Sequence, residues 1–346
     1  MALLLDGDGM MDRRDATQIG ARADAALRES DQRWRVLASV SDAIYIESDA
    51  EELLWISSNS RAMHSRAVLL GGVPPGRPAA ETECVVEAGS LRIGSELRIR
   101  FRDAAVWQCQ LSARDAVCAA ESPQRMADAV NGAARGGTPK GVFTLLTLPA
   151  SAEGIAGPRE PFLTGLAAVV GPAIMALSQV SAGRGVSAGI REATGLVGLG
   201  EGLTPSGDDL LGGFLFTLRA LDSGLRGRLG VDWRSVDAWL HCVKPLTNKI
   251  SFAVLSDHTH GEAAAPLSDL LGAALGGSSE ERLAQLARRV AEIGHSSGWD
   301  MLAGVQCACL CVTRILEDPC FGLCVAADRG QASKWSKRQK EVVRVC

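Results

Sequence analysis

The spacing of the apolar residues changes once along the chain, and this change limits the possible folds more than any other feature. Between about Leu53 and Gln110 the apolar segments are short and rich in strand-forming residues, and Leu91–Ile93 and Leu97–Phe101 alternate with a period of two. Beyond residues 149–160, which are rich in proline and glycine, the pattern is almost entirely helical. The sequence therefore predicts an α+β fold, with a small, mostly antiparallel β-rich N-terminal domain followed by a predominantly helical C-terminal domain.

The same change of pattern suggests where the parts of the chain begin and end. We expect four segments: an N-terminal extension with a helix at 1–50, the β-rich domain at 51–150, the helical domain at 160–315 and a divergent basic tail at 316–346. The helix of the first segment is expected between about Ala16 and Ser39. The tail from Ala327 onward carries six basic and two acidic residues, which is typical of a solvated terminus.

The clearest helix of the C-terminal part is expected between Glu280 and Ile293. Its apolar residues recur at helical spacing and fall on one face. Ser278 and Glu281 form a capping box at its start, and Gly294 provides the stop at its end.

The composition excludes several classes of function. Hydrophobic residues make up 47% of the chain and charged residues 22%, so a disordered protein is excluded. A net charge of −4 and an aromatic content of 4% argue against a basic, base-stacking surface, so no nucleic-acid partner is expected. No uninterrupted apolar run approaches the ~18 residues of a membrane span, and Ala2–Leu5 is too short for a secretion signal. We therefore expect a cytoplasmic protein with no membrane partner.

The ten cysteines and five histidines raise the question of a metal site. The densest cysteine group is Cys307, Cys309 and Cys311. On a helix these side chains point in directions that cannot converge on one ion. His258, His260 and Glu262 lack the i, i+4 spacing of a zinc hydrolase helix. We expect free, buried thiols in a reducing compartment, no metal and no cofactor.

The most informative segment is the run at 198–213, which reads Gly-Leu-Gly-Glu-Gly-Leu-Thr-Pro-Ser-Gly-Asp-Asp-Leu-Leu-Gly-Gly. Three glycines alternate before a helix start, where either Thr204 or Ser206 is the expected N-cap. A glycine-rich loop that leads into a helix can hold an anion, because free N–H groups and the positive end of the helix dipole meet there. No Gly-Lys-Ser/Thr follows, so the segment is not a nucleotide-binding P-loop.

A second segment repeats this pattern 91 residues later. Ser206–Gly213 and Ser297–Gly304 share the order Ser-Gly-x-Asp-apolar-Leu-small-Gly. One interpretation is that these are two ordinary helix starts, because capping boxes are common. The alternative is that both helix starts face one pocket and grip opposite ends of a small anionic substrate, with His295 and Ser296 lining the same site.

These motifs resemble those of the AllH family. The resemblance rests on Gly198–Asp209, on the run Thr247-Asn248-x-Ile250-Ser251 and on Gly294–Asp300, and it is strongest over about 160–315. It implies a subunit of the transferase oxamate carbamoyltransferase in allantoin and purine nitrogen catabolism. The implied partners are an FdrA-like and an AllG-like protein subunit, which form a hetero-oligomer with this chain. The implied reaction converts oxalurate and phosphate into oxamate and carbamoyl phosphate.

This chemistry suggests roles for the polar residues of the motifs. Asp208 or Asp209 would hold the amide nitrogen or transfer a proton, and His295 is the titratable candidate near neutral pH. The candidate substrate- and anion-binding residues are Gly200, Gly202, Thr204, Ser206, Gly207, Asn248, Ser251, Ser296, Ser297 and Asp300.

Two other functions stay open on sequence grounds. The first is a non-catalytic partner that assembles or regulates an FdrA-type protein resembling an acyl-CoA synthetase. The second is a transferase that acts on another small carboxylate, because relatives within a family need not share a substrate.

Overall fold

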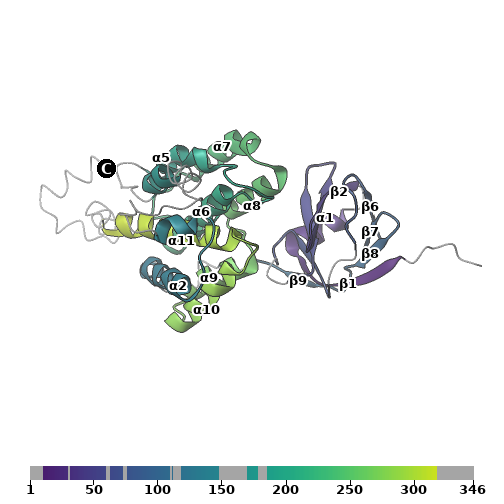
Figure 1. Cartoon of the computed structure of the whole chain (residues 1–346), viewed down its shortest axis with the longest axis horizontal. Helices are drawn as coiled ribbons and strands as arrows, with labels where there is room; N and C mark the ends of the chain where they lie inside the picture. The colour runs from purple at the N-terminus through teal and green to yellow at the C-terminus, as the bar shows by residue number, and fades with distance from the viewer. Residues whose placement is uncertain are drawn as a thin grey trace, which may run out of the picture. The chain divides into compact units, whose positions relative to one another are not determined.

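The computed structural model describes residues 11–29, 32–59, 63–72, 76–109, 111, 118–147, 170–177 and 185–317. The chain divides into two compact units (Figure 1). The first contains Met1–Gln110 and Glu262–Ala265, and the second contains Leu111–Gly261 and Pro266–Cys346. The expected α+β fold, β-rich first and helical afterwards, is confirmed. The expected linker at 149–160 and residues 318–346 of the expected tail lie outside the described residues.

The β-rich unit is built on one sheet that closes on itself. Its elements are β1 (Asp12–Gly20), α1 (Ala21–Arg28), β2 (Trp34–Ser39), β3 (Ala43–Ser48), β4 (Leu53–Ser57), β5 (Ala67–Leu70), β6 (Glu83–Glu87), β7 (Ser90–Ile93), β8 (Leu97–Arg100) and β9 (Ala105–Trp107). The strand order is β5-β4-β3-β2-β6-β7-β8-β1-β9, and β1 pairs with β5 as well as with β8. This extra pairing makes the sheet barrel-like and leaves fewer open edges.

Most neighbouring strands in this sheet run antiparallel, as the sequence predicts. Among the strands of the described residues, only the pairs β1–β8, β1–β9 and β4–β5 are parallel. The inward-facing apolar residues follow the period of two that marks a strand. Ile44 and Ile46 on β3 and Leu54 and Ile56 on β4 are all fully buried in the same core. Apolar residues therefore alternate along these strands because every second side chain fills the interior of the barrel.

The helix expected between Ala16 and Ser39 is wrong for most of its length. Only Ala21–Arg28 is helical, because the residues on either side are strands. Ile19 pairs with Val68 of β5, and Val36 is fully buried in the barrel core. Tertiary pairing has overridden a local pattern that a helix would also fit.

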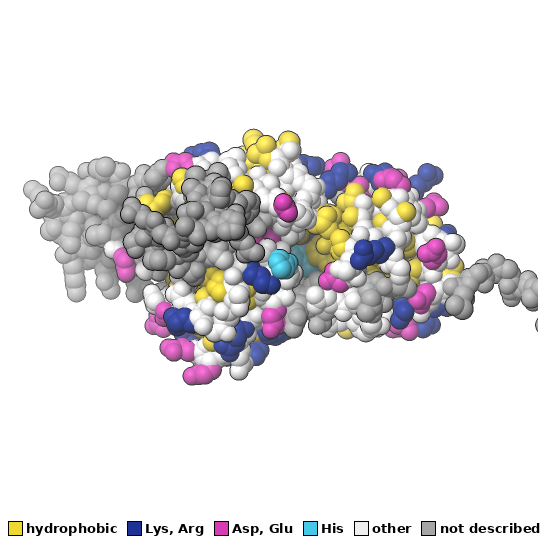
Figure 2. Space-filling view, in the orientation of Figure 1, with side chains coloured by type: hydrophobic (Ala, Val, Ile, Leu, Met, Phe, Trp, Pro, Cys, Tyr) yellow, Lys and Arg dark blue, Asp and Glu magenta, His cyan; other side chains and the backbone are white. Residues whose placement is uncertain are grey.

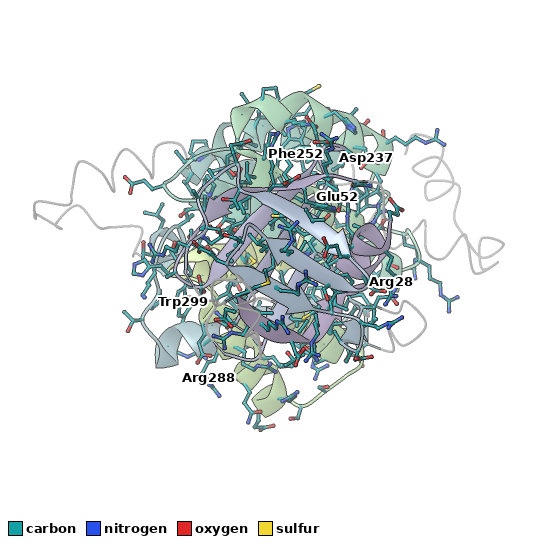
Figure 3. The ribbon with its side chains drawn as sticks, turned by 90° about the vertical axis from the view of Figure 1, so that its right-hand side faces the viewer. Arg28, Glu52, Asp237, Phe252, Arg288 and Trp299 are labelled. Carbon is teal, nitrogen blue, oxygen red and sulfur yellow. The ribbon has the colours of Figure 1, made fainter. Side chains whose placement is uncertain are left out.

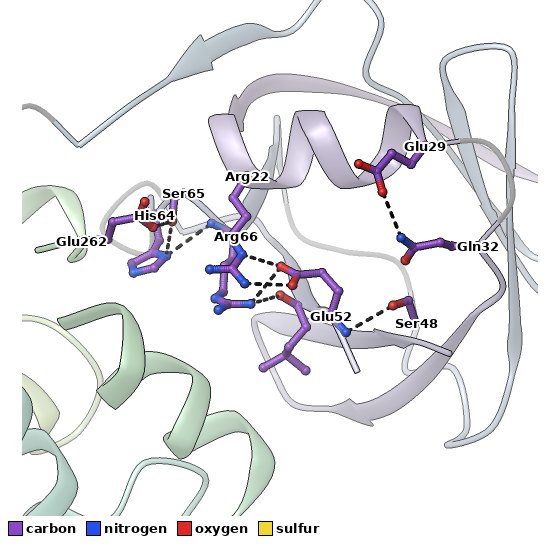
Figure 4. A network of polar contacts seen from close by, with 10 residues as sticks. Arg22, Glu29, Gln32, Ser48, Glu52, His64, Ser65, Arg66 and Glu262 are labelled. Carbon is purple, nitrogen blue, oxygen red and sulfur yellow. Dashed lines mark hydrogen bonds and ion pairs between the residues drawn. The ribbon is translucent and has the colours of Figure 1, made fainter. Parts of the chain in front are cut away.

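A polar network ties residues 262–265 into the β-rich unit (Figure 4). The Ser65 hydroxyl donates to Glu262 at 2.6 Å, and the Ala265 N–H donates to the Met63 carbonyl at 2.8 Å. The Nδ1 atom of His64 lies 3.3 Å from the Ser65 hydroxyl. Burial, together with the charge of Arg66, lowers the pKa of His64 to about 3, so this imidazole is neutral at physiological pH.

The second unit is helical. Its elements are α2 (Ser122–Gly136), α3 (Phe143–Thr147), α5 (Val186–Glu192), η3 (Ala193–Leu196), α6 (Ser206–Gly224), α7 (Trp233–Val243), η4 (Lys244–Leu246), α8 (Lys249–His260), α9 (Ala265–Leu275), α10 (Glu280–Ala291) and α11 (Ser297–Glu317). Helices α6 and α11 are buried around almost their whole circumference, which marks them as core helices.

Within the described residues, α11 is long and apolar enough to cross a membrane by length and composition. However, 72% of that stretch is buried inside the protein, as in the core helix of a folded domain. Its thiols Cys307, Cys309 and Cys311 are buried and unpaired, and burial raises the pKa of each. On the surface, Figure 2 shows acidic and basic side chains interspersed over the visible face.

Helix α10 begins at Glu280, as predicted, but its N-cap lies one residue later than expected. Ser279, not Ser278, is the N-cap, and its hydroxyl accepts from the Arg282 N–H at 3.3 Å. The apolar stripe is buried as expected, and Gly294 follows with a φ of +59°. Serines at 278 and 279 offer the same capping chemistry, so the sequence does not choose between them.

Helices α6 and α11 pack at unusually short range through glycines. A Cβ on Gly213 of α6 would lie 2.1 Å from the Met301 carbonyl oxygen of α11. In return, a Cβ on Gly304 of α11 would lie 2.0 Å from the Leu210 carbonyl oxygen of α6. The two contacts are reciprocal, because Gly213 and Leu210 correspond to Gly304 and Met301 in the repeated motif. Only glycine allows backbones to approach this closely.

We expect Gly304→Ala to separate the two helices and to lower the free energy of unfolding by about 1–3 kcal/mol or more, because the added methyl meets backbone that cannot rotate away. The matched control is Gly132→Ala in α2, where only the end of the Arg135 side chain comes within 4.0 Å. That change should raise stability by roughly 0.5–1 kcal/mol. Urea unfolding measures both. A Gly304→Ala protein as stable as wild type contradicts the close packing.

Candidate functional site

The glycine-rich loop before α6 adopts a backbone that only glycine takes at low cost. Gly198, Gly200 and Gly202 have φ angles of +75°, +120° and +95°. A Cβ at Gly198 would meet the Leu246 carbonyl oxygen at 2.2 Å, and a Cβ at Gly200 would meet the Ser206 nitrogen at 2.8 Å. Nothing lies within 4 Å of the same position at Gly202, where the loop faces open space. The alternating glycines therefore fold the loop tightly onto the start of α6.

The start of α6 differs from both caps expected from the sequence. The N-cap is Pro205, and no side chain caps the helix, so the predictions of Thr204 and Ser206 as N-caps are wrong. The Pro205 carbonyl accepts from the N–H groups of Asp208 and Asp209 at 2.9 and 3.1 Å. The Gly207 N–H donates to the Leu199 carbonyl at 2.8 Å. These three N–H groups are thus engaged by the chain itself and are not free to bind an anion.

Asp208 is a structural centre of this region. Its Oδ1 accepts from the Gly198 N–H at 2.8 Å, and its Oδ2 accepts from the hydroxyls of Thr247 and Ser251, the latter at 2.6 Å. The side chain is only 3% exposed. These bonds fasten the glycine loop, the turn before α8 and the first turn of α8 to one carboxylate. Asp208 therefore holds the site together, and its oxygens are already occupied.

Asn248, the N-cap of α8, fixes the loop from the other side. Its Oδ1 accepts from the N–H groups of Ile250 and Ser251, both at 3.0 Å. Its Nδ2 donates to the Leu203 carbonyl at 3.0 Å. Asn248 and Ser251, both predicted as binding residues, thus support the loop through hydrogen bonds within the chain.

Asp209 and Asp300 occupy equivalent places at the starts of α6 and α11. Asp209 is 4% exposed, and Asp300 is fully buried. The Asp300 Oδ1 accepts from the Val142 N–H at 2.6 Å. The Oδ2 atoms of both carboxyls are buried and have no hydrogen-bond partner among the described residues. Buried polar atoms are nearly always paired in native proteins, so two such atoms at matched positions point to a bound group.

The hydroxyls around these carboxyls come from both motifs. The Thr204 and Ser297 hydroxyls lie 3.0 Å apart, and both hydrogen-bond toward Asp209. Asp300 in turn receives the hydroxyls of Ser206 and Ser296. Each aspartate is thus served by a serine from the opposite motif, Ser297 for Asp209 and Ser206 for Asp300. The structure brings together the two helix starts that the sequence placed 91 residues apart.

The backbone repeats this correspondence only in part. The Asp300 N–H donates to the Ser296 carbonyl at 3.0 Å, as Asp209 does to Pro205 in the first motif. The glycine bonds differ, because the Gly298 N–H donates to the Ile293 carbonyl five residues earlier at 3.0 Å, and the Gly207 N–H donates to the Leu199 carbonyl eight residues earlier. The aspartate bonds are those of any helix, so the likeness of the two starts rests on the crossed serines and on the reciprocal glycine contacts of α6 and α11. The repeated sequence pattern therefore marks a repeated structural unit.

Burial governs the protonation of the two carboxyls. It raises the pKa of Asp209 well above the ordinary 3.8, and the charges of Asp300 and Asp208 raise it further, while hydrogen bonds from Ser297 and Thr204 lower it. Burial likewise raises the pKa of Asp300, against hydrogen bonds from Ser206, the Val142 N–H and Ser296. The pair consequently retains a proton at a pH where isolated carboxyls are ionised.

The segment at 137–143 completes the site, and the sequence analysis missed it. Gly141 has a φ of +56°, and a Cβ there would meet Asp300 Oδ1 at 2.1 Å. Trp299, labelled in Figure 3, packs on Phe143 with ring centroids 5.3 Å apart and holds this segment against α11. The signal in the sequence is the break Gly136-Gly137-Thr138-Pro139, which indicated only the end of a helix.

His295 lies outside the buried part of the site. It is exposed, and it follows Gly294 in the turn before α11. No described group of three or more His, Cys, Asp or Glu side chains is arranged to hold a metal ion. The groups of the buried site that can donate or accept protons are therefore the carboxyls of Asp209 and Asp300 and the serine and threonine hydroxyls beside them.

The raised pKa values predict a pH-dependent stability. A carboxyl whose pKa is higher in the folded state stabilises the fold below its unfolded value, near 3.8, and this contribution is lost as pH rises through the folded value. Asp209→Asn removes the contribution. The free energy of unfolding of the variant minus that of wild type should therefore rise between about pH 4 and pH 7. Urea unfolding across this range measures it, and a constant or falling difference contradicts the buried, proton-retaining Asp209.

The comparisons with known proteins agree with this geometry. Residues 196–309 match the family model described as oxamate carbamoyltransferase subunit AllH, and the matched segment contains both Ser-Gly-x-Asp motifs. No curated protein and no solved structure matches the chain. The match over residues 196–309 supports the AllH family predicted from the sequence motifs.

Proposed function

We propose that this chain is the catalytic subunit of an oxamate carbamoyltransferase and that the reaction takes place beside Asp209 and Asp300. The family is named for a subunit of that enzyme. The observation that carries the proposal is the pair of buried Oδ2 atoms that have no partner among the described residues, at matched positions in the segment that matches the family model. Each such atom costs about 1–3 kcal/mol when left unpaired, and a ligand that supplies the missing partners offsets that cost.

The reaction needs a proton at a defined place. In the direction that consumes oxalurate, a phosphate oxygen attacks the carbamoyl carbon, a C–O bond forms, and the C–N bond to the departing oxamate nitrogen breaks. That nitrogen must gain a proton as it leaves. Protonated Asp209 supplies it and becomes a carboxylate, and in the reverse direction the carboxylate takes the proton back. A carboxyl with a raised pKa suits this role, because it is protonated when the reaction begins.

The anionic parts of the substrates meet the glycine loop. Residues 200–202 are exposed, and Gly202 has open space where a side chain would lie. Backbone N–H groups in such a loop bind phosphate or carboxylate oxygens. Thr204 connects this loop to the buried carboxyls, because its hydroxyl reaches Ser297 and Asp209. A substrate with an anionic end and an amide end fits this order of groups.

The wider setting is also proposed. We place the enzyme in the cytoplasm, in allantoin degradation, with FdrA-like and AllG-like subunits as partners and with neither metal nor cofactor on this chain. The buried free thiols of α11 support a reducing compartment. The family name, which is that of a subunit, supports assembly with other chains.

The test is phosphorolysis of oxalurate by this chain co-purified with its FdrA-like and AllG-like partners. Asp209→Asn keeps the shape of the side chain but cannot donate the proton, so carbamoyl phosphate formation should fall by about 100-fold or more. The matched control is Asp222→Asn, a buried aspartate of the same helix that accepts from Trp233 Nε1 at 2.9 Å outside the site. Once folded, that variant should keep the rate.

Recovery of the complex separates the alternatives. Loss of the rate in an intact Asp209→Asn complex supports catalysis on this chain. An unchanged rate in that complex contradicts it and favours the non-catalytic partner. An intact wild-type complex without oxalurate phosphorolysis contradicts the substrate and turns the search to other small carboxylates.

A further inference from the structure

We propose that Asp209 and Asp300 together form the specificity element of this site, and that they select a primary amide over a carboxylate at the end of the ligand that reaches them. The inference rests on the proposed function for the choice of ligand. It goes beyond that function by assigning discrimination between chemically similar acids to two named residues.

Two carboxyl oxygens, from equivalent positions of the repeated motif, are available to a ligand. The Oδ2 atoms of Asp209 and Asp300 are both buried, and neither has a hydrogen-bond partner in the part of the chain that the structure describes. The other oxygen of Asp300 is fixed by the Val142 N–H at 2.6 Å, and Gly141 packs directly against this carboxyl. The free oxygen is therefore held in place by neighbours that have no room to move. A prearranged site of this kind favours ligands that supply the missing partners.

Charge decides which ligand group fits. The charged groups that face Asp209 and raise its pKa are Asp300 and Asp208, both acidic. Asp208 is already satisfied by three hydrogen bonds. A carboxylate from the ligand would add a further negative charge in a dry place, where juxtaposed like charges cost several kcal/mol.

A primary amide meets the opposite conditions. It is neutral, its N–H groups donate, and its carbonyl accepts. When one of the two carboxyls is protonated, the pair offers both an accepting oxygen and a donating hydroxyl, which are the partners that an amide needs. Bound in this way, the amide nitrogen lies against a carboxylate. In oxamate that nitrogen is the atom that receives the carbamoyl group. The contact that selects the amide therefore also positions the reacting nitrogen.

The experiment measures binding to the complex of this chain with its partners by calorimetry. The three probes are oxamate, which has one amide and one carboxylate, oxalate, which has two carboxylates, and oxamide, which has two amides. We expect oxamate to bind at least about 100-fold more tightly than oxalate, and oxamide to bind more tightly than oxalate although it lacks any charge.

The variants assign this preference to residues. Asp209→Asn and Asp300→Asn each introduce an amide that can donate to a carboxylate. Each should therefore lower the preference for oxamate, measured as the oxamate affinity divided by the oxalate affinity, by about tenfold or more. Asp222→Asn, which is buried in α6 but makes its bonds elsewhere, should leave the ratio unchanged. Because the wild-type ratio needs no variant, the proposal stays testable even where a substitution prevents folding.

The outcomes separate this inference from the proposed function. Equal affinity for oxamate and oxalate, a preference for oxalate, or no binding of any probe overturns the inference. A preference for the amides that both Asp→Asn variants reduce supports it, even where the same complex fails to convert oxalurate. In that last case the amide-binding site is supported and the proposed reaction is contradicted.

Discussion

The close approach of α6 and α11 is the contact on which the helical unit depends. Gly213 and Gly304 each leave room for a carbonyl oxygen of the opposite helix, at about 2 Å from where a Cβ would stand. The starts of the two helices therefore come together with their serines and aspartates interleaved. Side chains of ordinary size at these glycines would push the starts apart and open the carboxyl pair to water. The site is thus a consequence of how two core helices pack.

That packing also sets the chemistry. In water, Asp209 and Asp300 would be ionised at neutral pH and would have little preference among small acids. Burial raises the pKa of both carboxyls, and we propose that a proton held by one of them lets the site both donate and accept. We propose the glycine loop outside the pair as the place for an anion, because the N–H groups of Gly207, Asp208 and Asp209 donate to the Leu199 and Pro205 carbonyls. In this proposal one end of the site binds charge and the other binds an amide.

Much of this could be predicted from the sequence, and the misses have physical reasons. The period of two and the later helical pattern predict the α+β order, and the repeated motif predicts that two helix starts belong together. The region at 16–39 was misjudged because strand pairing, not local pattern, decides its structure. The caps of α6 were misjudged because Pro205 and the Leu199 carbonyl satisfy its first turn. The role of Gly141 and Val142 in the site could not be predicted, because no pattern in the sequence around them indicates that Val142 contacts a residue 158 positions away.

The most direct test of the central claim is a crystal structure of the complex with oxamate bound. The account predicts that the amide nitrogen and carbonyl of oxamate lie about 2.7–3.2 Å from the Oδ2 atoms of Asp209 and Asp300. It also predicts that the carboxylate end points to the backbone of residues 200–204. Oxamate bound with its carboxylate against the two aspartates, or bound away from them, would contradict the account.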